Sequence, residues 1–167
     1  MSSNLKDERV LVTGASGYIA AHIVKLLLES GYRVRGTVRD LKNTKKVAPL
    51  KALASSTTCH ELELCEADLL DANSWPNAVR ECSYVIHTAS PFPSEIPSDE
   101  SLICGPAVDG TLNVLKACVL QDNQAMVKRV VLTSSVAAIA GDVFGNGRIY
   151  NENDRPDIKK LNPYPKR

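Results

Sequence analysis

The sequence predicts an α/β domain in which helices cover both faces of a doubly wound parallel sheet. Three observations support this fold class. Short β-branched runs alternate with longer stretches of helical periodicity, there are five such runs, and a glycine-rich turn follows the first. Strands that alternate with helices imply crossovers between parallel neighbours. A chain of 167 residues, 44% hydrophobic and 23% charged, is long enough for one domain with its own core.

Five strands are expected from the runs rich in valine, leucine and isoleucine, at residues 9–13, 32–38, 61–66, 84–88 and 130–134. The fifth run is apolar throughout, so we expect that strand to be buried. Sheets of this class usually continue beyond the fifth strand, and no further strand is predicted in the chain. The sequence therefore predicts one incomplete domain over residues 1–167.

Four helices are expected between these strands, at residues 18–30, 44–53, within 71–82 as a short one, and at 106–120. Gly31 is a suitable stop for the first. Pro49 is an obstacle that would shorten or split the second. Asp71 and Ser74 are candidate caps for the third. Residues 141–167 are rich in Gly, Asn, Asp and Pro and are predicted to be mostly loop.

The composition excludes several classes of protein. A formal net charge of +1 provides no field to attract nucleic acid or an anionic membrane. No signal peptide and no apolar run of membrane-spanning length is predicted, so a cytoplasmic protein is expected. The five cysteines lack the spacing of a metal site, and we expect reduced, mostly buried thiols and no bound metal. They are Cys59, Cys65, Cys82, Cys104 and Cys118.

The glycine-rich turn carries the first chemical signal. The first strand ends in Thr13-Gly14-Ala15-Ser16-Gly17-Tyr18-Ile19-Ala20, and a helix follows at once. Gly14 permits a tight turn, Gly17 permits close approach of a pyrophosphate, and Ala20 permits close packing of helix on strand. The helix N-terminus presents free N–H groups to phosphates. No lysine followed by Ser or Thr is present, which disfavours a nucleoside triphosphatase and leaves a dinucleotide site.

The end of the second strand indicates which dinucleotide. Val38 occupies the position where a carboxylate would bind a free ribose 2′-hydroxyl, and Arg39 follows it. Arg39 and Lys46 are cations suited to a 2′-phosphate, which favours NADP(H) over NAD(H). In the competing interpretation Asp40 binds the ribose. Asp68, after the third strand, is a candidate for the adenine edge, for a turn cap, or for both.

Further motifs in the same order resemble the extended short-chain dehydrogenase/reductases, and within them the dihydroflavonol-reductase-like NADPH-dependent carbonyl reductases. The resemblance covers residues 10–164. It rests on the glycine turn and the second-strand end, and on Ala67-Asp68-Leu69, Val85-Ile86-His87-Thr88-Ala89-Ser90-Pro91, Gly110-Thr111-Leu112-Asn113-Val114-Leu115 and Arg129-Val130-Val131-Leu132-Thr133-Ser134-Ser135.

The resemblance implies a role for each matching position. Implied pyrophosphate contacts are Gly14, Ser16, Gly17, Tyr18 and Ile19, with Arg39 and Lys46 at the 2′-phosphate and Asp68 and Leu69 at the adenine. Thr88, Ala89 and Ser90 would lie under the ribose and nicotinamide, with Ser134 beside the cofactor. Ser135 and Tyr164 resemble the catalytic serine and tyrosine. Without the resemblance, Ser134 and Ser135 would be strand-end caps. His87 is expected to be a core or edge histidine with its polar atoms satisfied, and not a base.

The chain ends close to the implied catalytic pair. The family's tyrosine belongs to a Tyr-x-x-x-Lys motif, and the lysine that would serve Tyr164 would be residue 168. Lys166 is two residues from Tyr164 and would not share its helix face. We therefore expect this chain alone to reduce carbonyl substrates weakly or not at all. An uncovered fifth strand would also offer an edge for self-association.

Three functions remain open on the sequence. The first is an NADP(H)-dependent oxidoreductase that reduces a small-molecule ketone or aldehyde to an alcohol. The second is a non-catalytic NADP(H)-binding short isoform or regulatory module. The third is an epimerase or dehydratase, which would normally use NAD and an acidic residue near Val38, so Arg39 argues against it.

Overall fold

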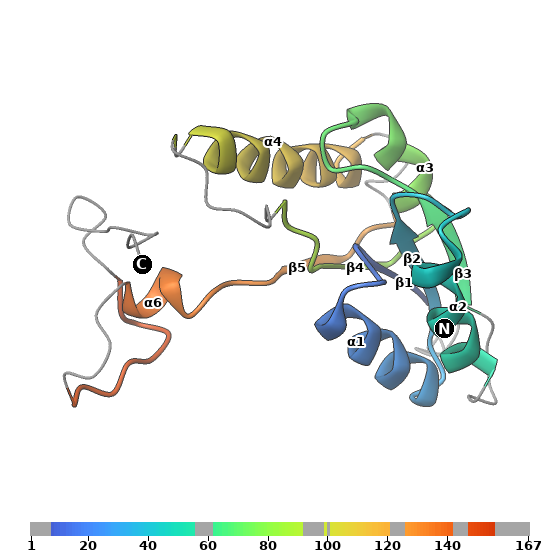
Figure 1. Cartoon of the computed structure of the whole chain (residues 1–167), viewed down its shortest axis with the longest axis horizontal. Helices are drawn as coiled ribbons and strands as arrows, with labels where there is room; N and C mark the ends of the chain where they lie inside the picture. Colours follow the sequence, from blue (N-terminus) through green and yellow to red (C-terminus); the bar gives the residue numbers. More distant parts are fainter. Residues whose placement is uncertain are drawn as a thin grey trace. The chain divides into compact units, whose positions relative to one another are not determined.

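The five strands of the computed structural model form a single parallel sheet in the order β3-β2-β1-β4-β5 (Figure 1). The structure describes residues 8–55, 62–91, 99, 101–120, 126–141 and 147–155. The strands are β1 (Arg9–Val12), β2 (Arg33–Val38), β3 (Leu62–Glu66), β4 (Tyr84–His87) and β5 (Arg129–Leu132). This order reverses direction between β1 and β4, which confirms the doubly wound, dinucleotide-binding class of sheet.

The four predicted helices are present, with differences at proline, and the short helix α6 is additional. They are α1 (Tyr18–Glu29), α2 (Thr44–Ser55), the 3₁₀ turn η2 (Ala72–Ser74), α3 (Trp75–Val79), α4 (Ser101–Cys118) and α6 (Ala137–Ala140). Pro49 lies inside α2 without dividing it. Asp71 caps η2, because its side chain accepts the Asn73 N–H, whereas the Ser74 side chain makes no cap bond to α3.

Helix α4 begins five residues before the expected start at Pro106. The carboxylate of Asp99 accepts the Ser101 N–H at 2.9 Å and supplies the N-terminal cap. Pro106 deprives only the carbonyl of Leu102 of its helical donor, and Leu102 is exposed, so water can take that donor's place. The Asp99 cap was the sequence signal for the earlier start.

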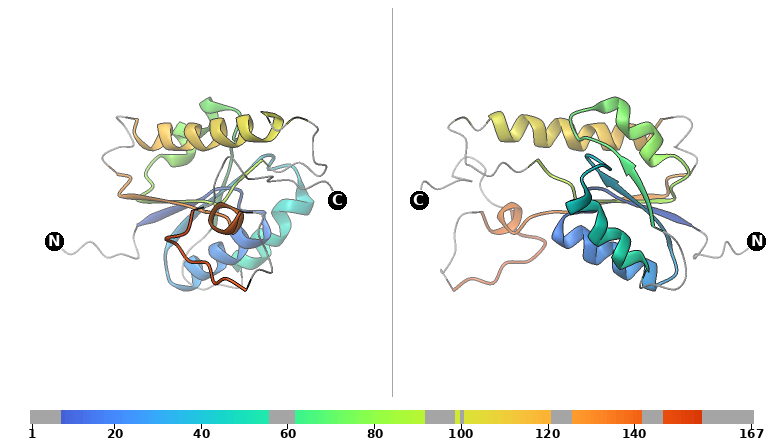
Figure 2. Two further views of the ribbon diagram at one scale, coloured as in Figure 1. Left: turned by 90° about the vertical axis from the view of Figure 1, so that its left-hand side faces the viewer. Right: turned by 45° about the vertical axis from the view of Figure 1, so that its right-hand side comes forward.

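Two apolar cores lie on opposite faces of the sheet. Helices α3 and α4 cover one face, where Leu11, Trp75 and Val114 are buried together, and α1 and α2 cover the other, around Val24 and Val34 (Figure 2). Successive strand residues point to opposite faces, so Leu11 belongs to the first core and Val12 to the second. Both faces of β1 are therefore buried, as expected for a central parallel strand.

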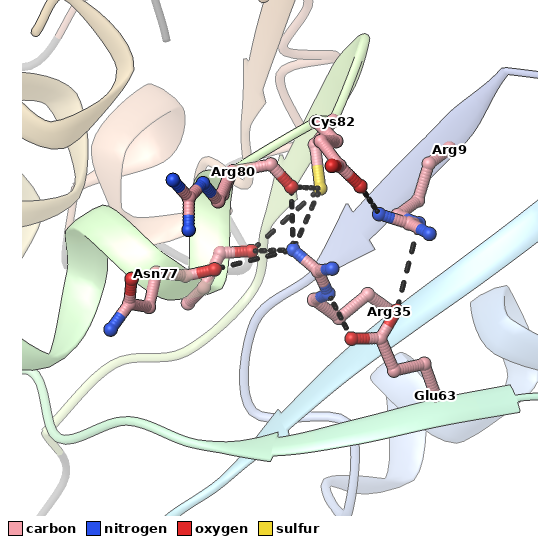
Figure 3. A network of polar contacts seen from close by, with 8 residues as sticks. Arg9, Arg35, Glu63, Asn77, Arg80 and Cys82 are labelled. Atoms are coloured by element: carbon pink, nitrogen blue, oxygen red, sulfur yellow. Dashed lines mark hydrogen bonds and ion pairs between the residues drawn. The ribbon is translucent and has the colours of Figure 1, made fainter. Parts of the chain in front are cut away.

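A buried arginine links the sheet to the end of α3 (Figure 3). One terminal nitrogen of Arg35, on β2, donates to the carbonyl oxygens of Ala78 at 3.0 Å and Arg80 at 2.6 Å. Its Nε lies 2.8 Å from Glu63 on β3, as an ion pair and not an aligned hydrogen bond. A cation at a helix C-terminus satisfies carbonyl groups that have no helical donor. This contact fixes α3 against the sheet.

The expectation that β5 is buried is wrong. β5 pairs with β4, and among the described residues it is an edge strand. Val131 and Leu132 are 51% and 53% exposed, and only Val130 packs against the core beneath α4. Burial of an apolar strand needs a covering layer on each face, and the described residues provide one only at Val130.

The chain divides into two compact units, residues 1–132 and 133–167. All five strands belong to the first unit, and α6 belongs to the second. Within the described part of the chain, no helix combines the length and apolar character needed to cross a membrane. The described cysteines form no disulfide, and burial raises the pKa values of Cys65, Cys82 and Cys118 to about 11. Cys59 lies outside the described residues.

Candidate functional site

A pocket of about 420 Å³ lies at the carboxyl ends of the strands in the first unit. The segments that follow β1, β2, β3 and β4 all contribute to its lining. The pocket includes the junction of β1 and β4, where the strand order reverses. Open α/β sheets bind their ligands at this position, because the loops after adjacent strands diverge to opposite faces there. The volume is in the range of small-molecule sites.

The glycine turn after β1 is held by Thr37, the penultimate residue of β2. The Gly14 N–H donates to Thr37 Oγ1 at 2.9 Å, and the Ala15 N–H donates to the Thr37 carbonyl at 2.9 Å. Gly14 has φ of +64°, a left-handed conformation that favours glycine. Gly17 then starts α1 without any side-chain cap, so the first-turn N–H groups remain available to an anion.

Two glycines provide the close approaches that the turn requires. A Cβ on Gly14 would lie 3.0 Å from the Cβ of Ala89, in the segment after β4. A Cβ on Gly36, in β2, would lie 2.7 Å from the Cβ of Ala15 and would force the two segments apart. The turn is thus fitted closely between the ends of β2 and β4.

The end of β2 brings one cation to the pocket. Arg39 lines it and has no ion-pair partner among the described residues. The carboxylate of the next residue, Asp40, accepts the Lys42 N–H at 2.8 Å and does not line the pocket. Glu66, at the end of β3, accepts the Leu41 N–H at 2.8 Å and fixes this loop. Arg39 is therefore the one cationic residue that lines the pocket among the described residues.

The segment after β3 forms the opposite side of the same end. Asp68 and Leu69 line the pocket, and Asp68 Oδ1 accepts the Leu70 N–H at 2.9 Å. The indole N–H of Trp75 donates to the Asp68 carbonyl at 2.8 Å. A Cβ on Gly110 of α4 would lie 2.8 Å from the Cβ of Leu69, so the helix touches this segment directly. Asp68 is thus a turn cap that also faces the pocket, and the two expected roles are compatible.

The segment after β4 completes the pocket with Thr88, Ala89 and Ser90. The backbone N–H groups of Thr88 and Ala89 donate to Thr13 Oγ1 at 3.1 and 3.0 Å. His87, the last residue of β4, is 1% exposed, which confirms a core position, but the expectation that its polar atoms are satisfied is wrong for Nε2, which has no partner among the described residues. Burial lowers its pKa from the ordinary value of 6.5.

Nine of the expected cofactor-binding residues come together in this pocket: Gly14, Ser16, Gly17, Arg39, Asp68, Leu69, Thr88, Ala89 and Ser90. The side chains of Tyr18 and Ile19 are exposed and do not line the pocket. Only their backbone N–H groups, at the start of α1, remain as candidates for the expected pyrophosphate contacts. Lys46, in α2, is exposed and also lies outside the lining.

The expected catalytic residues Ser135 and Tyr164, and the expected cofactor-binding residue Ser134, belong to the second unit of the chain. Ser134 and Ser135 lie in the second unit and are exposed, and Ser135 Oγ accepts the Ala137 N–H at 3.2 Å, in the turn before α6. This bond lies within the turn before α6, and the N-cap residue of α6, Val136, has no side-chain cap bond. Tyr164 lies outside the described residues.

Several lining residues were not identified from the sequence. Thr37, Ala67, Leu70, Trp75 and Pro91 all line the pocket. Thr37 had a usable signal, because a hydroxyl residue just before the end of the second strand can bond the glycine turn across the sheet. Trp75 gave no such signal, since its role depends on the path of the chain after β3. No cluster of three metal-binding side chains occurs in the described ranges.

Comparison with known proteins identifies relatives of this chain. The model of the NAD dependent epimerase/dehydratase family matches residues 10–167. Cinnamoyl-CoA reductase CAD2 of Medicago truncatula is 45% identical over 140 residues, which are 84% of this chain and 41% of the relative. Dihydroflavonol 4-reductase of Arabidopsis thaliana is 40% identical over 154 residues, 92% of this chain and 39% of the relative. The chain thus spans about two fifths of the length of these relatives.

Solved structures show the same relationship. Gre2 from Candida albicans superimposes with a TM-score of 0.72 and 33% identity over 90% of this chain and 44% of that one. A second structure of Candida albicans Gre2, in complex with NADPH, gives a TM-score of 0.66 and 36% identity over 81% of this chain and 39% of that one. The resemblance in the motifs is therefore confirmed, and the chain belongs to the NAD dependent epimerase/dehydratase family, with the dihydroflavonol-reductase-like reductases among its relatives.

Proposed function

We propose that this chain binds NADP(H) in the pocket at the strand ends and belongs to an enzyme that reduces a ketone or aldehyde to an alcohol. The observation that carries the cofactor proposal is the guanidinium of Arg39 at the end of β2. A carboxylate at this end of the second strand selects a free ribose 2′-hydroxyl, and a cation selects a 2′-phosphate. The nearby carboxylate of Asp40 is bonded to the Lys42 N–H and lies outside the lining.

The residues present fit a dinucleotide. Gly14 and Gly17 line the pocket, Gly14 packs directly against Ala89, and α1 offers uncapped N–H groups for the pyrophosphate. Asp68 and Leu69 would hold the adenine, and Arg39 would pair with the 2′-phosphate and can stack on the base. Thr88, Ala89 and Ser90 would support the ribose and nicotinamide. The described Gre2 complex with NADPH supports this assignment.

The reaction we propose for the whole protein is hydride transfer to a carbonyl carbon. NADPH supplies the hydride when bound. The hydroxyl of Tyr164 would donate a proton to the developing alkoxide, and Ser135 Oγ would hydrogen-bond the same oxygen and stabilise its charge. Ser134 would lie beside the cofactor. Relatives named cinnamoyl-CoA reductase and dihydroflavonol 4-reductase, and the solved structure of yeast methylglyoxal/isovaleraldehyde reductase Gre2, support this class of reaction.

Binding and turnover are separate parts of the proposal. The described pocket lies within residues 1–132, whereas Ser134, Ser135 and Tyr164 lie in the second unit. We expect the isolated 167-residue chain to bind NADPH and to reduce carbonyl substrates weakly, because it spans about two fifths of its relatives' length. A chain that binds without measurable turnover would be consistent with the alternative of a non-catalytic NADP(H)-binding module.

Titration of the chain with NADPH and NADH tests the cofactor proposal. The wild-type chain is expected to prefer NADPH. Arg39→Ala should lower that preference by about tenfold or more, since a charge-assisted contact with phosphate is worth roughly 1.5–3 kcal/mol. Arg33→Ala is the matched control, because Arg33 is exposed at the start of the same strand and does not line the pocket. Equal affinity for the two nucleotides, or an unchanged preference in Arg39→Ala, would contradict the proposal.

A further inference from the structure

His87 is a buried histidine beside the pocket for which the proposed reaction has no use. Its Nδ1 lies 2.7 Å from Thr13 Oγ1, directly after β1. Its Nε2 is also buried and has no hydrogen-bond partner among the described residues. A half-paired polar ring in a core is costly, and an apolar side chain of similar size would avoid that cost. A function of His87 is therefore expected to depend on Nδ1, the nitrogen that is paired with Thr13.

The hydroxyl of Thr13 fixes the tautomer of His87. Thr13 Oγ1 accepts N–H groups from Thr88 at 3.1 Å and from Ala89 at 3.0 Å. A hydroxyl has two acceptor lone pairs and one proton. The two amides occupy both lone pairs, so the Thr13 proton is left for His87 Nδ1. A neutral imidazole that accepts at Nδ1 carries its own proton on Nε2.

The same hydroxyl sets the position of the pocket wall. Thr88 and Ala89 line the pocket, and the Thr88 hydroxyl also donates to the Thr13 carbonyl, so this segment makes three hydrogen bonds to Thr13. Ala89 in turn lies against the glycine turn, since a Cβ on Gly14 would be 3.0 Å from its Cβ. His87 thus orients a hydroxyl that holds the segment packed on the glycine turn. The contact spans β1 and β4, where the strand order reverses.

We propose that His87, as its neutral Nε2–H tautomer, is a positioning residue that orients Thr13 and thereby fixes Thr88 and Ala89 against the glycine turn. The hydrogen-bond arrangement stands without any ligand. Its effect on nucleotide affinity rests on the proposed function. An ordinary core residue would affect stability through its size and apolar character. His87 should instead affect the position of Thr88 and Ala89 through the hydrogen-bond acceptor at Nδ1.

Two matched pairs of variants in the full chain test this proposal by NADPH titration. Thr13→Val removes the hydroxyl and His87→Leu removes its acceptor, and each should weaken NADPH binding by about tenfold. Thr13→Ser keeps the hydroxyl and His87→Asn offers a carbonyl oxygen near Nδ1, and each should stay within about threefold of wild type. Val85→Ala controls for general destabilisation, because Val85 is fully buried on the same strand and outside the pocket.

Nitrogen-15 NMR of the histidine side chains in the wild-type chain gives an independent reading. The expected signature for His87 is a protonated Nε2 and an unprotonated Nδ1. The Thr88 and Ala89 amide resonances should move in His87→Leu and stay near their wild-type positions in His87→Asn. A proton on Nδ1, unmoved amides in His87→Leu, or a loss of affinity in Val85→Ala equal to that in His87→Leu would overturn the proposal. If the wild-type chain binds no NADPH, the proposed function fails, and the amide resonances alone decide the role of His87.

Discussion

Strand β4 has two neighbouring strands, β1 and β5, that differ in burial and in the polar contacts at their carboxyl ends. On one side, β1 buries Leu11 and Val12 completely and ends in the polar contacts of Thr13 with His87, Thr88 and Ala89. On the other side, β5 exposes about half of Val131 and Leu132. Both neighbours are short apolar parallel strands by sequence. The comparison shows that burial depends on the layers packed over a strand and that the pocket is built on the buried side.

Gly14→Val should have the largest effect on the buried side of β4. A β-branched residue at φ of +64° is strained, and its Cβ would lie 3.0 Å from the Cβ of Ala89. We expect a loss of about 3 kcal/mol or more in the free energy of unfolding, together with loss of NADPH binding. Chemical denaturation and nucleotide titration measure the two effects.

Gly105→Ala is the control for that change. Gly105 lies in α4 with open space around its Cβ position, so alanine should stabilise the chain by about 0.5–1 kcal/mol. If Gly105→Ala also lowered the free energy of unfolding, the loss in Gly14→Val could not be attributed to the close contact between residue 14 and Ala89.

Truncation of valine on each side of the comparison should separate the two environments directly. Val85→Ala, in the core beneath α3 and α4, should cost about 2 kcal/mol, because methyl groups are removed from a packed interior. Val131→Ala, on β5, should cost about 0.5 kcal/mol or less, since that side chain is half exposed. Denaturant midpoints measure both, and equal losses would show that β5 is covered in solution.

Thr37→Val should weaken the pocket while the sheet remains intact. The change leaves the Gly14 N–H without its acceptor, at a cost of about 1–3 kcal/mol that should also reduce NADPH affinity. Thr111→Val is the matched control, because that hydroxyl only bonds back to the Ala107 carbonyl within α4. Retention of full NADPH affinity in Thr37→Val would mean that the glycine turn holds its position without this bond.

The pH dependence of stability gives the smallest predicted effect. Burial lowers the pKa of His87 in the folded chain from its ordinary value of 6.5. Below about pH 6.5, His87 is therefore protonated in the unfolded chain while it is still neutral in the folded chain. Stability from this group is complete above about pH 6.5 and is lost as the pH falls toward the lower folded pKa, by at most about 1.4 kcal/mol per pH unit.

Unfolding free energies measured between pH 7 and 5 test this contribution. His87→Asn should reduce the slope relative to wild type. A steeper slope in His87→Asn than in wild type would contradict a neutral buried His87.

The sequence was sufficient for the elements that local chemistry determines. Strand and helix periodicity, the glycine turn and the positions of Arg39 and Asp68 were all readable, because each depends on a few neighbouring residues. The exposure of β5 could not be read, since an apolar run does not reveal which layers cover it. Thr37, Trp75 and the pairing of Thr13 with His87 join residues far apart in the chain, and only the folded arrangement of β1, β2 and β4 brings them together.

An NMR titration of the isotope-labelled chain with NADPH tests the central claim most directly. If the pocket at the strand ends is the cofactor site, the amide resonances of Gly14 to Ile19, Arg39, Asp68, Leu69 and Thr88 to Ser90 should shift together. Those of Val131 and Leu132 on β5 should stay in place. Shifts centred on β5, or no shifts at NADPH concentrations that saturate related reductases, would contradict a cofactor site built on the buried side of β4.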